Sequence, residues 1–354
     1  MSAGEEFREI LKLRARGPAH LGFLDPGLCE SAMELMLSGD ATPVQIGGFL
    51  LVGRAVGDSP AELAAYARAA LSFVRTIEAP PGSPVVTVTG GFDGKIRTFN
   101  VGAAASLVAA AAGAHVLMLG SEGTPPKEGR TVFDALRDLG APSPHDALEA
   151  ELSLANHSFA ATSAEHYLPE LYALLGLRRE MVRRTVLNVV EKIVSPVPGS
   201  RMMVGITHRP FLKSVPAALV DLGVEDALVY GAIEGSDEAP LDGNSSLVRI
   251  REGEAEEFCV PPDSVGLPQA TRSRIPWKDA EDECRRTLLA LEGEEGPVWS
   301  LILYNAALRL WMAGGEDRLL VEWVEKAEEA VHSGGALELL ARLRQPASVG
   351  AERS

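Results

Sequence analysis

A glycine-rich stretch between residues 85 and 100 constrains this chain more than any other segment. It begins with Val85 to Val88, an apolar run rich in β-branched side chains that is typical of a buried strand. The Gly90-Gly91 pair follows, and glycine lets the backbone turn tightly where a side chain would clash. Small residues at 102–105 then open an apolar helix. This order predicts backbone N–H groups that converge on one point, as in anion-binding loops. A tight strand–helix connection that binds nothing explains the same pattern equally well.

The charge balance narrows the possible partners. The 354 residues include 49 acidic and 33 basic side chains, for a net charge of −16 at pH 7. Such an acidic chain argues against general binding to nucleic acid or to an anionic membrane, although a local basic groove stays possible. Cys29, Cys259 and Cys284 are too far apart for a metal-ligand motif, and no signal peptide or membrane span is evident. We therefore expect a protein of the reducing cytoplasm.

Proline-led helix starts mark the N-terminal part of the chain as helical. Asp25-Pro26, Thr42-Pro43 and Ser59-Pro60 each place a capping side chain before a proline at the first helical position. The last of these helices is expected to run from 59 to about 77. The apolar periodicity after each start predicts a small all-helical domain. From Val85 onward strands and helices alternate, which predicts a larger α/β domain with a mainly parallel central sheet.

The predicted domains are discontinuous in sequence. We expect a helical domain over 1–78, with 168–196 packing onto it, and an α/β domain formed by 79–167 and 197–354. Edge strands are expected at 246–250 and 256–260. A ligand cleft should lie between the domains, at the carboxyl ends of the strands.

Several motifs occur in the order in which the anthranilate phosphoribosyltransferase family carries them. Gly90-Gly91, Asp93-Gly94 and Thr98-Phe99-Asn100 resemble the diphosphate-binding loop of that family. Arg184-Thr185 resembles the start of the helix that carries its anthranilate-binding arginine. Gly235-Ser236-Asp237-Glu238 resembles its magnesium-binding acidic pair. The resemblance covers nearly the whole chain and extends to the nucleoside phosphorylase and glycosyltransferase family 3 fold.

This resemblance implies a magnesium-dependent phosphoribosyltransferase of tryptophan biosynthesis. We also expect a homodimer through the N-terminal helices, because their apolar positions are too many for one three-helix unit to bury alone: Leu28, Ala32, Leu35, Ile46 and Leu50. The residues implied to bind the diphosphate of phosphoribosyl pyrophosphate are Gly90, Gly91, Asp93, Gly94, Lys95, Arg97, Thr98 and Asn100. Arg184 is implied to bind the carboxylate of an anthranilate-like acceptor. Asp237 and Glu238 are implied to bind Mg²⁺, which prefers carboxylate and phosphate oxygens. No catalytic acid or base is assigned.

The chain also departs from the family pattern at several phosphate contacts. Met118-Leu119-Gly120-Ser121-Glu122 stands where the family has Lys-His-Gly-Asn-Arg, and Gly102-Ala103 stands where it has Ser-Thr hydroxyls. Glu191-Lys192 replaces a Gly-Pro pair. The Gly94-Lys95-x-Arg97 element and the loop around Glu122 resemble a second branch of the family, which binds nucleic acid and does not transfer phosphoribosyl groups. A non-catalytic nucleic-acid- or ligand-binding protein on the same fold is therefore the alternative function.

Ordinary structural roles compete with each functional interpretation. Four loop cations are either phosphate ligands or solvated side chains: Lys95, Arg97, Lys127 and Arg130. Arg184 can instead form an ion pair on the helix surface with Glu180 or Glu191. The adjacent acids Asp237 and Glu238 would most often be solvated in a polar loop, and His208 is interpreted as a capping or surface residue. We favour the enzyme, because the acidic pair is retained and the net charge is negative.

Overall fold

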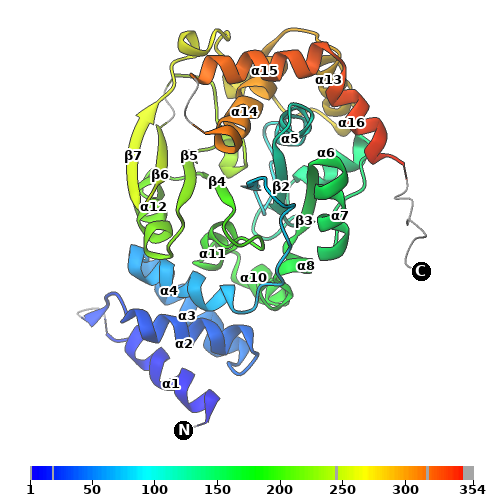
Figure 1. Ribbon diagram of the computed structural model, residues 1–354. Helices are drawn as coiled ribbons and strands as arrows, with labels where there is room; N and C mark the ends of the chain where they lie inside the picture. The colour runs from blue at the N-terminus through cyan, green and yellow to red at the C-terminus, as the bar shows by residue number, and fades with distance from the viewer. Residues whose placement is uncertain (1, 18–19, 244–245, 316–318, 346–354) are drawn as a thin grey trace.

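Helices α1 to α4 form the N-terminal part of the computed structural model, which describes residues 2–17, 20–243, 246–315 and 319–345 (Figure 1). Their bounds are α1 (Ala3–Arg14), α2 (Pro26–Leu37), α3 (Pro43–Val56) and α4 (Pro60–Leu71). Each of the three predicted proline starts is confirmed. At α3, Thr42 N–H donates to Gln45 Oε1 at 2.8 Å and Gln45 N–H donates back to Thr42 Oγ1 at 3.3 Å. This reciprocal cap satisfies N–H groups that a helix start leaves without partners.

The prediction that the helix from Ser59 runs to about residue 77 is wrong, because α4 ends at Leu71. The following backbone bonds to distant segments instead. Arg75 N–H donates to the carbonyl of Tyr167 at 2.8 Å, and Ile77 N–H donates to that of Pro196 at 2.9 Å. These tertiary hydrogen bonds replace the helical ones and lead the chain into the sheet.

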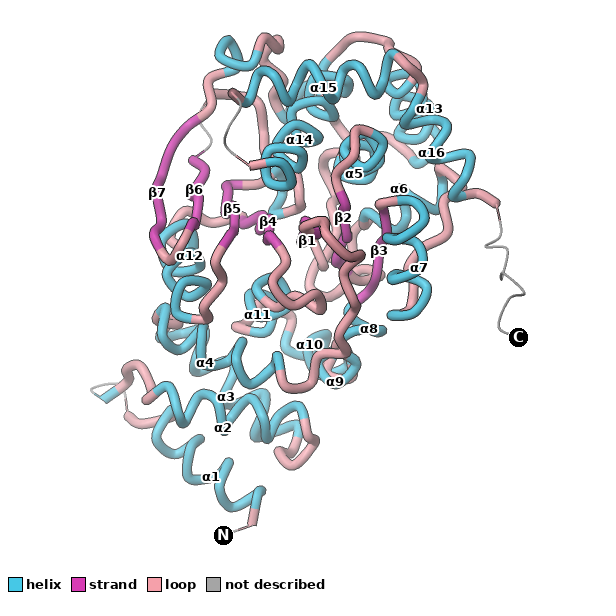
Figure 2. The backbone as a smooth tube through the Cα atoms, in the orientation of Figure 1, coloured by secondary structure: helices cyan, strands magenta, loops and turns pink. Residues whose placement is uncertain are grey.

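A seven-stranded sheet, as the structure describes the chain, forms the centre of the α/β part. The strands are β1 (Val85–Thr89), β2 (His115–Gly120), β3 (Phe159–Ser163), β4 (Arg201–Ile206), β5 (Asp226–Gly231), β6 (Ser246–Arg251) and β7 (Glu254–Cys259). Their order is β3-β2-β1-β4-β5-β6-β7 (Figure 2). The first five strands pair in parallel, and β6 and β7 pair antiparallel at one edge. The predicted parallel sheet and its two edge strands are confirmed.

The strand order changes between β1 and β4: β2 and β3 are added on one side of β1, and β4 and β5 are added on the other side. Thr89 at the end of β1 pairs with Leu119 of β2 on one side and with Val204 of β4 on the other. In open α/β sheets the loops that leave such a switch point diverge and form a ligand crevice at the carboxyl ends of the strands. The glycine-rich loop after Thr89 begins there.

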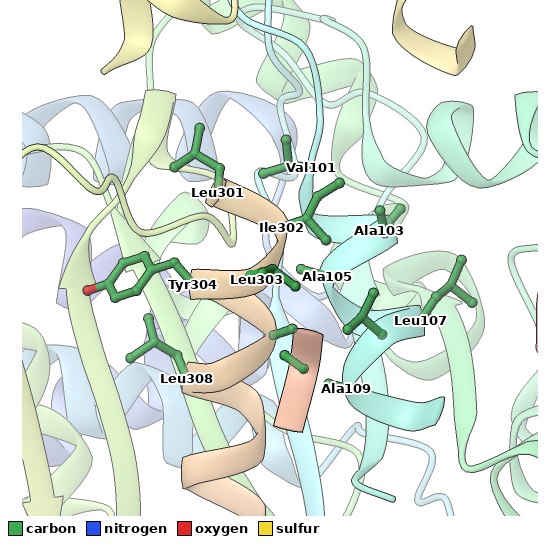
Figure 3. Close-up of a cluster of buried hydrophobic side chains, with 14 of the residues drawn as sticks. Val101, Ala103, Ala105, Leu107, Ala109, Leu301, Ile302, Leu303, Tyr304 and Leu308 are labelled. Carbon is green, nitrogen blue, oxygen red and sulfur yellow. The ribbon is translucent and has the colours of Figure 1, made fainter. Parts of the chain in front are cut away.

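Helices cover both faces of the sheet. One face carries α5 (Gly102–Ala111), α6 (Val132–Asp138), α13 (Ala280–Leu291), α14 (Pro297–Gly314), α15 (Leu320–His332) and α16 (Gly335–Leu343). Figure 3 shows α5 packed closely against α14, where Ala103 lies beside Ile302 and Ala105 lies beside Leu303. Burial of these apolar side chains fixes the start of α5 beneath the glycine-rich loop.

The other face joins the sheet to the N-terminal helices. It carries α7 (Ala147–His157), α8 (Ala164–Tyr167), α9 (Pro169–Tyr172), α10 (Leu175–Met181), α11 (Leu187–Ile193) and α12 (Phe211–Asp221). In Figures 1 and 2, α10 and α11 lie between the sheet and the N-terminal helices, and α10 contacts α3 while α11 contacts α4. Short 3₁₀ turns occur at Ile233–Gly235, Pro262–Val265 and Arg272–Arg274. Across the described ranges, no helix combines the length and apolar character that crossing a bilayer requires.

Candidate active site

The glycine-rich loop lies against the segment that follows β5. A Cβ atom built on Gly91 would lie 3.3 Å from the Cα of Ser236, and one on Gly102 would overlap the carboxylate of Asp237. Glycine suits these positions because the backbone of Ser236 lies close to Gly91, and the Asp237 carboxylate occupies the space that a side chain at position 102 would need. The structure therefore brings Gly90-Gly91 and the acidic pair together at one edge of the sheet.

Backbone pairing holds the middle of the loop in place. Gly94 has a φ of +72°, and a Cβ atom on it would collide with the backbone of Gly129. Lys95 N–H donates to the carbonyl of Arg130 at 2.8 Å, and Arg130 N–H donates back to that of Lys95 at 2.9 Å. The loops after β1 and β2 thus form a small two-stranded bridge.

The acidic pair is buried and paired with cations. Asp237 Oδ2 accepts from Arg309 Nη2 at 2.6 Å, and Glu238 forms an ion pair with Lys95. Glu238 is fully buried, and its other oxygen accepts from the N–H groups of Val101 at 2.8 Å and Gly102 at 3.0 Å. Burial raises the pKa of Glu238, while the Lys95 ammonium opposes that rise. Glu238 therefore caps α5, whose N-cap residue has no capping side-chain hydrogen bond of its own.

This arrangement does not fit a resident magnesium ion on Asp237 and Glu238. Three of the four carboxylate oxygens already accept hydrogen bonds from Arg309, Lys95 or the start of α5. Among the described residues, no three His, Cys, Asp or Glu side chains gather in a way that could hold a metal ion. Mg²⁺ needs several unshielded oxygens around an octahedron, and these two carboxylates present only one, Asp237 Oδ1.

Two further carboxylates accept hydrogen bonds from backbone N–H groups of the same loop. Glu234 accepts from the N–H groups of Ile96, Arg97 and Thr98, at 3.2, 3.1 and 2.8 Å. It also accepts from the Thr98 hydroxyl at 2.8 Å. Glu283 accepts from Asn100 N–H at 2.8 Å. Of the residues predicted to bind diphosphate, Lys95, Thr98 and Asn100 are therefore engaged with the chain's own acids.

Cations predicted to act alike have different roles. Lys95 is only 3 % exposed, so its interpretation as a solvated loop cation is wrong. Arg97 is exposed. Arg130 Nε donates to Glu283 Oε1 at 2.8 Å, and Arg130 also pairs with Asp138. Lys127 lies 3.4 Å from Asp93 Oδ1, and burial lowers the pKa of Lys127 although Asp93 opposes this.

Arg184 binds the glycine-rich loop directly. Its Nε donates to Asp93 Oδ2 at 2.9 Å, and its Nη2 contacts the same oxygen. The predicted alternative partners were Glu180 and Glu191, and both are wrong. Glu191 forms a buried pair with Arg178 instead, at 2.7 Å and 3.0 Å. Arg184 therefore joins α11 and its preceding turn to the loop after β1.

A cavity of about 280 Å³ lies beside this pair, between α11, the end of β4 and the glycine-rich loop. Its apolar lining includes Phe92, Ile193 and Phe211, and its polar lining includes Arg184 and Asn188. The predicted cleft at the carboxyl ends of the strands is thereby found. His208 is exposed, as predicted, and also lines this cavity.

Lys192 is a cavity residue that the sequence reasoning did not assign. Its Nζ donates to the carbonyls of Gly205 at 2.6 Å and Gly235 at 2.5 Å. Burial lowers the pKa of Lys192 to about 8, and Asp93 and Glu191 limit the fall. The signal that could have identified it was the replacement of the family's Gly-Pro by Glu191-Lys192, which puts a charge where the pattern has none.

Comparison with known proteins identifies the family of the chain. Residues 85–337 match the family described as glycosyl transferase family, a/b domain, and residues 8–74 match its helical bundle domain. The anthranilate phosphoribosyltransferase of Paramagnetospirillum magneticum is 32% identical over 314 residues, which cover 89% of each chain. That of Novosphingobium aromaticivorans is 33% identical over 317 residues, covering 90% of this chain and 94% of the relative.

Solved structures agree with the sequence relatives. The Thermus thermophilus anthranilate phosphoribosyltransferase superposes with a TM-score of 0.81 at 26% identity, covering 97% of this chain and 98% of that one. The Saccharomyces cerevisiae enzyme, described in complex with PRPP and Mg, shares the fold with a TM-score of 0.80 at 19% identity, over 96% and 97% of the two chains. The chain belongs to the anthranilate phosphoribosyltransferase family.

Proposed function

We propose that this chain is a phosphoribosyltransferase that moves the phosphoribosyl group from phosphoribosyl pyrophosphate to an anthranilate-like aromatic amine. The observation that carries the proposal is the cavity beside the Asp93–Arg184 pair, in a chain that aligns with anthranilate phosphoribosyltransferases over most of its length. With anthranilate as acceptor, the reaction would belong to tryptophan biosynthesis. The acceptor itself is the open part of the proposal.

The cavity suits a small aromatic acid. Its volume of about 280 Å³ is at the small end of ligand pockets, and Phe92 and Phe211 offer apolar contact to a single ring. Three lining cations, Arg54, Arg183 and Lys192, form no ion pair within the described part of the chain. In a protein with a net charge of −16, unpaired cations at one cavity favour an anionic ligand.

The reaction needs positioning more than covalent chemistry. The amine nitrogen forms a bond to C1 of the ribose as the C1–O bond to pyrophosphate breaks, and that electron pair leaves with pyrophosphate. The amine nitrogen then loses a proton, which the departing pyrophosphate or water accepts. Holding both reactants in line lowers the entropic part of the barrier. In this proposal Arg184 orients the acceptor carboxylate, and the loop after β1 lies on the donor side.

Magnesium enters the proposal with the donor, as the counter-ion of its diphosphate. The yeast relative is described with both molecules together. Asp237 and Glu238, as they lie here, are not assigned to the metal. Their predicted role as magnesium ligands therefore stays a prediction that needs the donor complex.

The alternative of a nucleic-acid-binding protein loses support. It relied on Lys95 and Arg97 as a basic element, but Lys95 is buried against Glu238. A buried ammonium that is already paired cannot release counterions from a nucleic-acid backbone.

We further propose a homodimer formed through the N-terminal helices. The apolar residues on which this prediction relied do not support it, because Ala32, Ile46 and Leu50 are buried within the single chain and Leu28 and Leu35 pack against the same core. On α3, Val44 is 85% exposed and Leu51 is 43% exposed, and a Cβ atom built on Gly47 between them would meet nothing within 4 Å. This apolar face would be covered by a second copy. Light scattering should give a dimer for the native chain and a monomer for Val44→Glu, whereas Leu148→Glu, at an exposed site on α7, should stay dimeric. A monomeric native chain would disprove the interface.

The domain division and the cellular location also remain proposals. The contacts of α10 with α3 and of α11 with α4 support a helical domain of 1–78 that includes 168–196. All three cysteines are free, which agrees with a reducing cytoplasm.

Pyrophosphate release in the presence of phosphoribosyl pyrophosphate, Mg²⁺ and a set of aminobenzoates tests the function. We expect release that depends on the acceptor, and a loss of about tenfold or more in its apparent affinity for Arg184→Met, because a charged hydrogen bond to the carboxylate is removed. Arg285→Met, at an exposed site on α13, is the matched control. No acceptor-dependent release with any aminobenzoate would reject the proposal.

A further inference from the structure

Six backbone N–H groups between residue 96 and the first residue of α5, Gly102, are already bonded to the chain's own carboxylates. Glu234 accepts from residues 96, 97 and 98, Glu283 accepts from Asn100, and Glu238 accepts from 101 and 102. Converging N–H groups of this kind are what an anionic ligand would use. Here internal acids from distant parts of the chain hold these positions.

Glu234 differs from the other two acids. Glu238 and Glu283 are at most 2% exposed, and each is paired with a cation, Lys95 or Arg130. Glu234 is half-buried and forms no ion pair within the described residues. Its carboxylate is therefore held only by the loop, through three N–H groups and the hydroxyl of Thr98. Of these three acids, Glu234 is the one whose carboxylate can move away without leaving a buried cation unpaired.

The backbone around Glu234 is shaped to present that carboxylate. Glu234 has a φ of 53°, in the left-handed region that few residues other than glycine adopt, and Gly235 follows with a φ of +76°. Lys127 donates to the carbonyl of Glu234 at 3.3 Å, and Lys192 donates to that of Gly235 at 2.5 Å. Two cations, of which Lys192 lines the cavity, thus hold a strained turn, and the side chain of Glu234 in that turn points to residues 96–98.

We propose that Glu234 is an internal substitute for a phosphate-class anion, and that a diphosphate group binds to residues 96–98 only by displacing it. This rests on the proposed function, since it concerns the donor side of the same site. Partial burial alone would raise the pKa of Glu234, but the hydrogen bonds from residues 96–98 outweigh it and lower the pKa. The carboxylate is therefore ionised at neutral pH and competes with an incoming anion.

Two variants remove the competitor in different ways. Glu234→Gly deletes the side chain and suits the positive φ, so the turn should persist. Glu234→Gln keeps the size of the side chain but leaves a neutral acceptor that competes more weakly. Glu325→Gln, at an exposed site on α15, makes the same change in net charge far from the loop.

Calorimetry with inorganic pyrophosphate, without acceptor, measures the competition directly. We expect the dissociation constant to fall about tenfold or more for Glu234→Gly, because a charged hydrogen-bonding competitor is lost, and by less for Glu234→Gln. Glu325→Gln should bind as the native chain does. Equal affinity in all four proteins would overturn the proposal, as would tighter binding in Glu325→Gln alone.

The test separates this inference from the proposed function. The native chain could release no pyrophosphate with any donor and acceptor while Glu234→Gly binds pyrophosphate more tightly than the native chain. That result would reject the transferase function and support the proposed role of Glu234 as a competing anion. Conversely, the native chain could be active while Glu234→Gly binds pyrophosphate with unchanged affinity. That result would support the transferase function and reject the proposed role of Glu234 as a competing anion. Circular dichroism and thermal unfolding of each variant establish that it is folded.

Discussion

Removal of the buried Lys95 ammonium should destabilise the protein in a way that depends on pH. The Lys95→Met variant leaves Glu238 fully buried with two N–H donors and no cation. Breaking a buried pair from one side typically costs about 3–5 kcal/mol, because an uncompensated charge remains. Glu238 can limit this cost by taking up a proton, since burial already raises its pKa.

The cost of that proton uptake follows from the ordinary glutamate pKa of 4.5. Protonating such a group costs about 1.4 kcal/mol for each pH unit above its unfolded pKa, which gives about 3.4 kcal/mol at pH 7 and about 1.4 kcal/mol at pH 5.5. We therefore expect Lys95→Met to lose roughly 3–4 kcal/mol at pH 7 and to recover about 2 kcal/mol of that loss at pH 5.5. The double variant Lys95→Met/Glu238→Gln should be more stable than Lys95→Met at pH 7.

Urea denaturation followed by tryptophan fluorescence is the assay. All four tryptophans lie at residues 277–323, in the α/β part that holds the pair, so the signal reports on the relevant unit. Lys213→Met, at an exposed site on α12, controls for the loss of a positive charge. The reasoning would be refuted if Lys95→Met lost the same free energy at both pH values, or if the added Glu238→Gln change gave no recovery.

Two further predictions concern other parts of the molecule. Burial raises the pKa of Asp58 to about 6, although the Arg14 guanidinium opposes this rise. The contribution of Asp58 to the free energy of unfolding is therefore full below the ordinary pKa of 3.8 and is lost as the pH rises through 6. Between pH 4 and 7 the melting temperature of Asp58→Asn should therefore not show this fall in stability. A variant whose melting temperature depends on pH as steeply as that of the native chain would contradict the prediction. Gly94→Ala should cost about 1–3 kcal/mol in urea more than Gly113→Ala, because both have positive φ but only the first collides with Gly129. Equal losses would show that the close approach is unimportant.

Local chemistry made much of the fold predictable. A capping residue before a proline begins α2, α3 and α4, because cap and proline act within one turn of their own helix. The glycines at 90–91 were interpreted as a tight turn; in the structure Gly90 lies close to Leu119 and Gly91 lies close to Ser236. The end of α4 was missed because its competitors, the carbonyls of Tyr167 and Pro196, lie far away in sequence.

The site was less predictable, because its pairs join distant segments. Lys95 and Glu238 are 143 residues apart, and Glu234 lies 136 residues beyond Thr98. The sequence shows each charge but does not show which opposite charge it meets. Lys95 and Arg97 illustrate this: they stand two residues apart in one loop, yet one is buried in an ion pair and the other is exposed. The motif resemblance pointed to Glu238, but it carried no information on Glu234 and Glu283, which also accept hydrogen bonds from the loop.

The most direct test is a crystal structure of the protein with phosphoribosyl pyrophosphate and Mg²⁺. In the proposed cycle, the carboxylate of Glu234 accepts hydrogen bonds from the N–H groups of residues 96–98 until phosphoribosyl pyrophosphate binds. We expect the diphosphate to accept hydrogen bonds from the N–H groups of residues 96–98, with the side chain of Glu234 turned away from them. A donor bound elsewhere in the molecule, with Glu234 still bonded to residues 96–98, would contradict the claim.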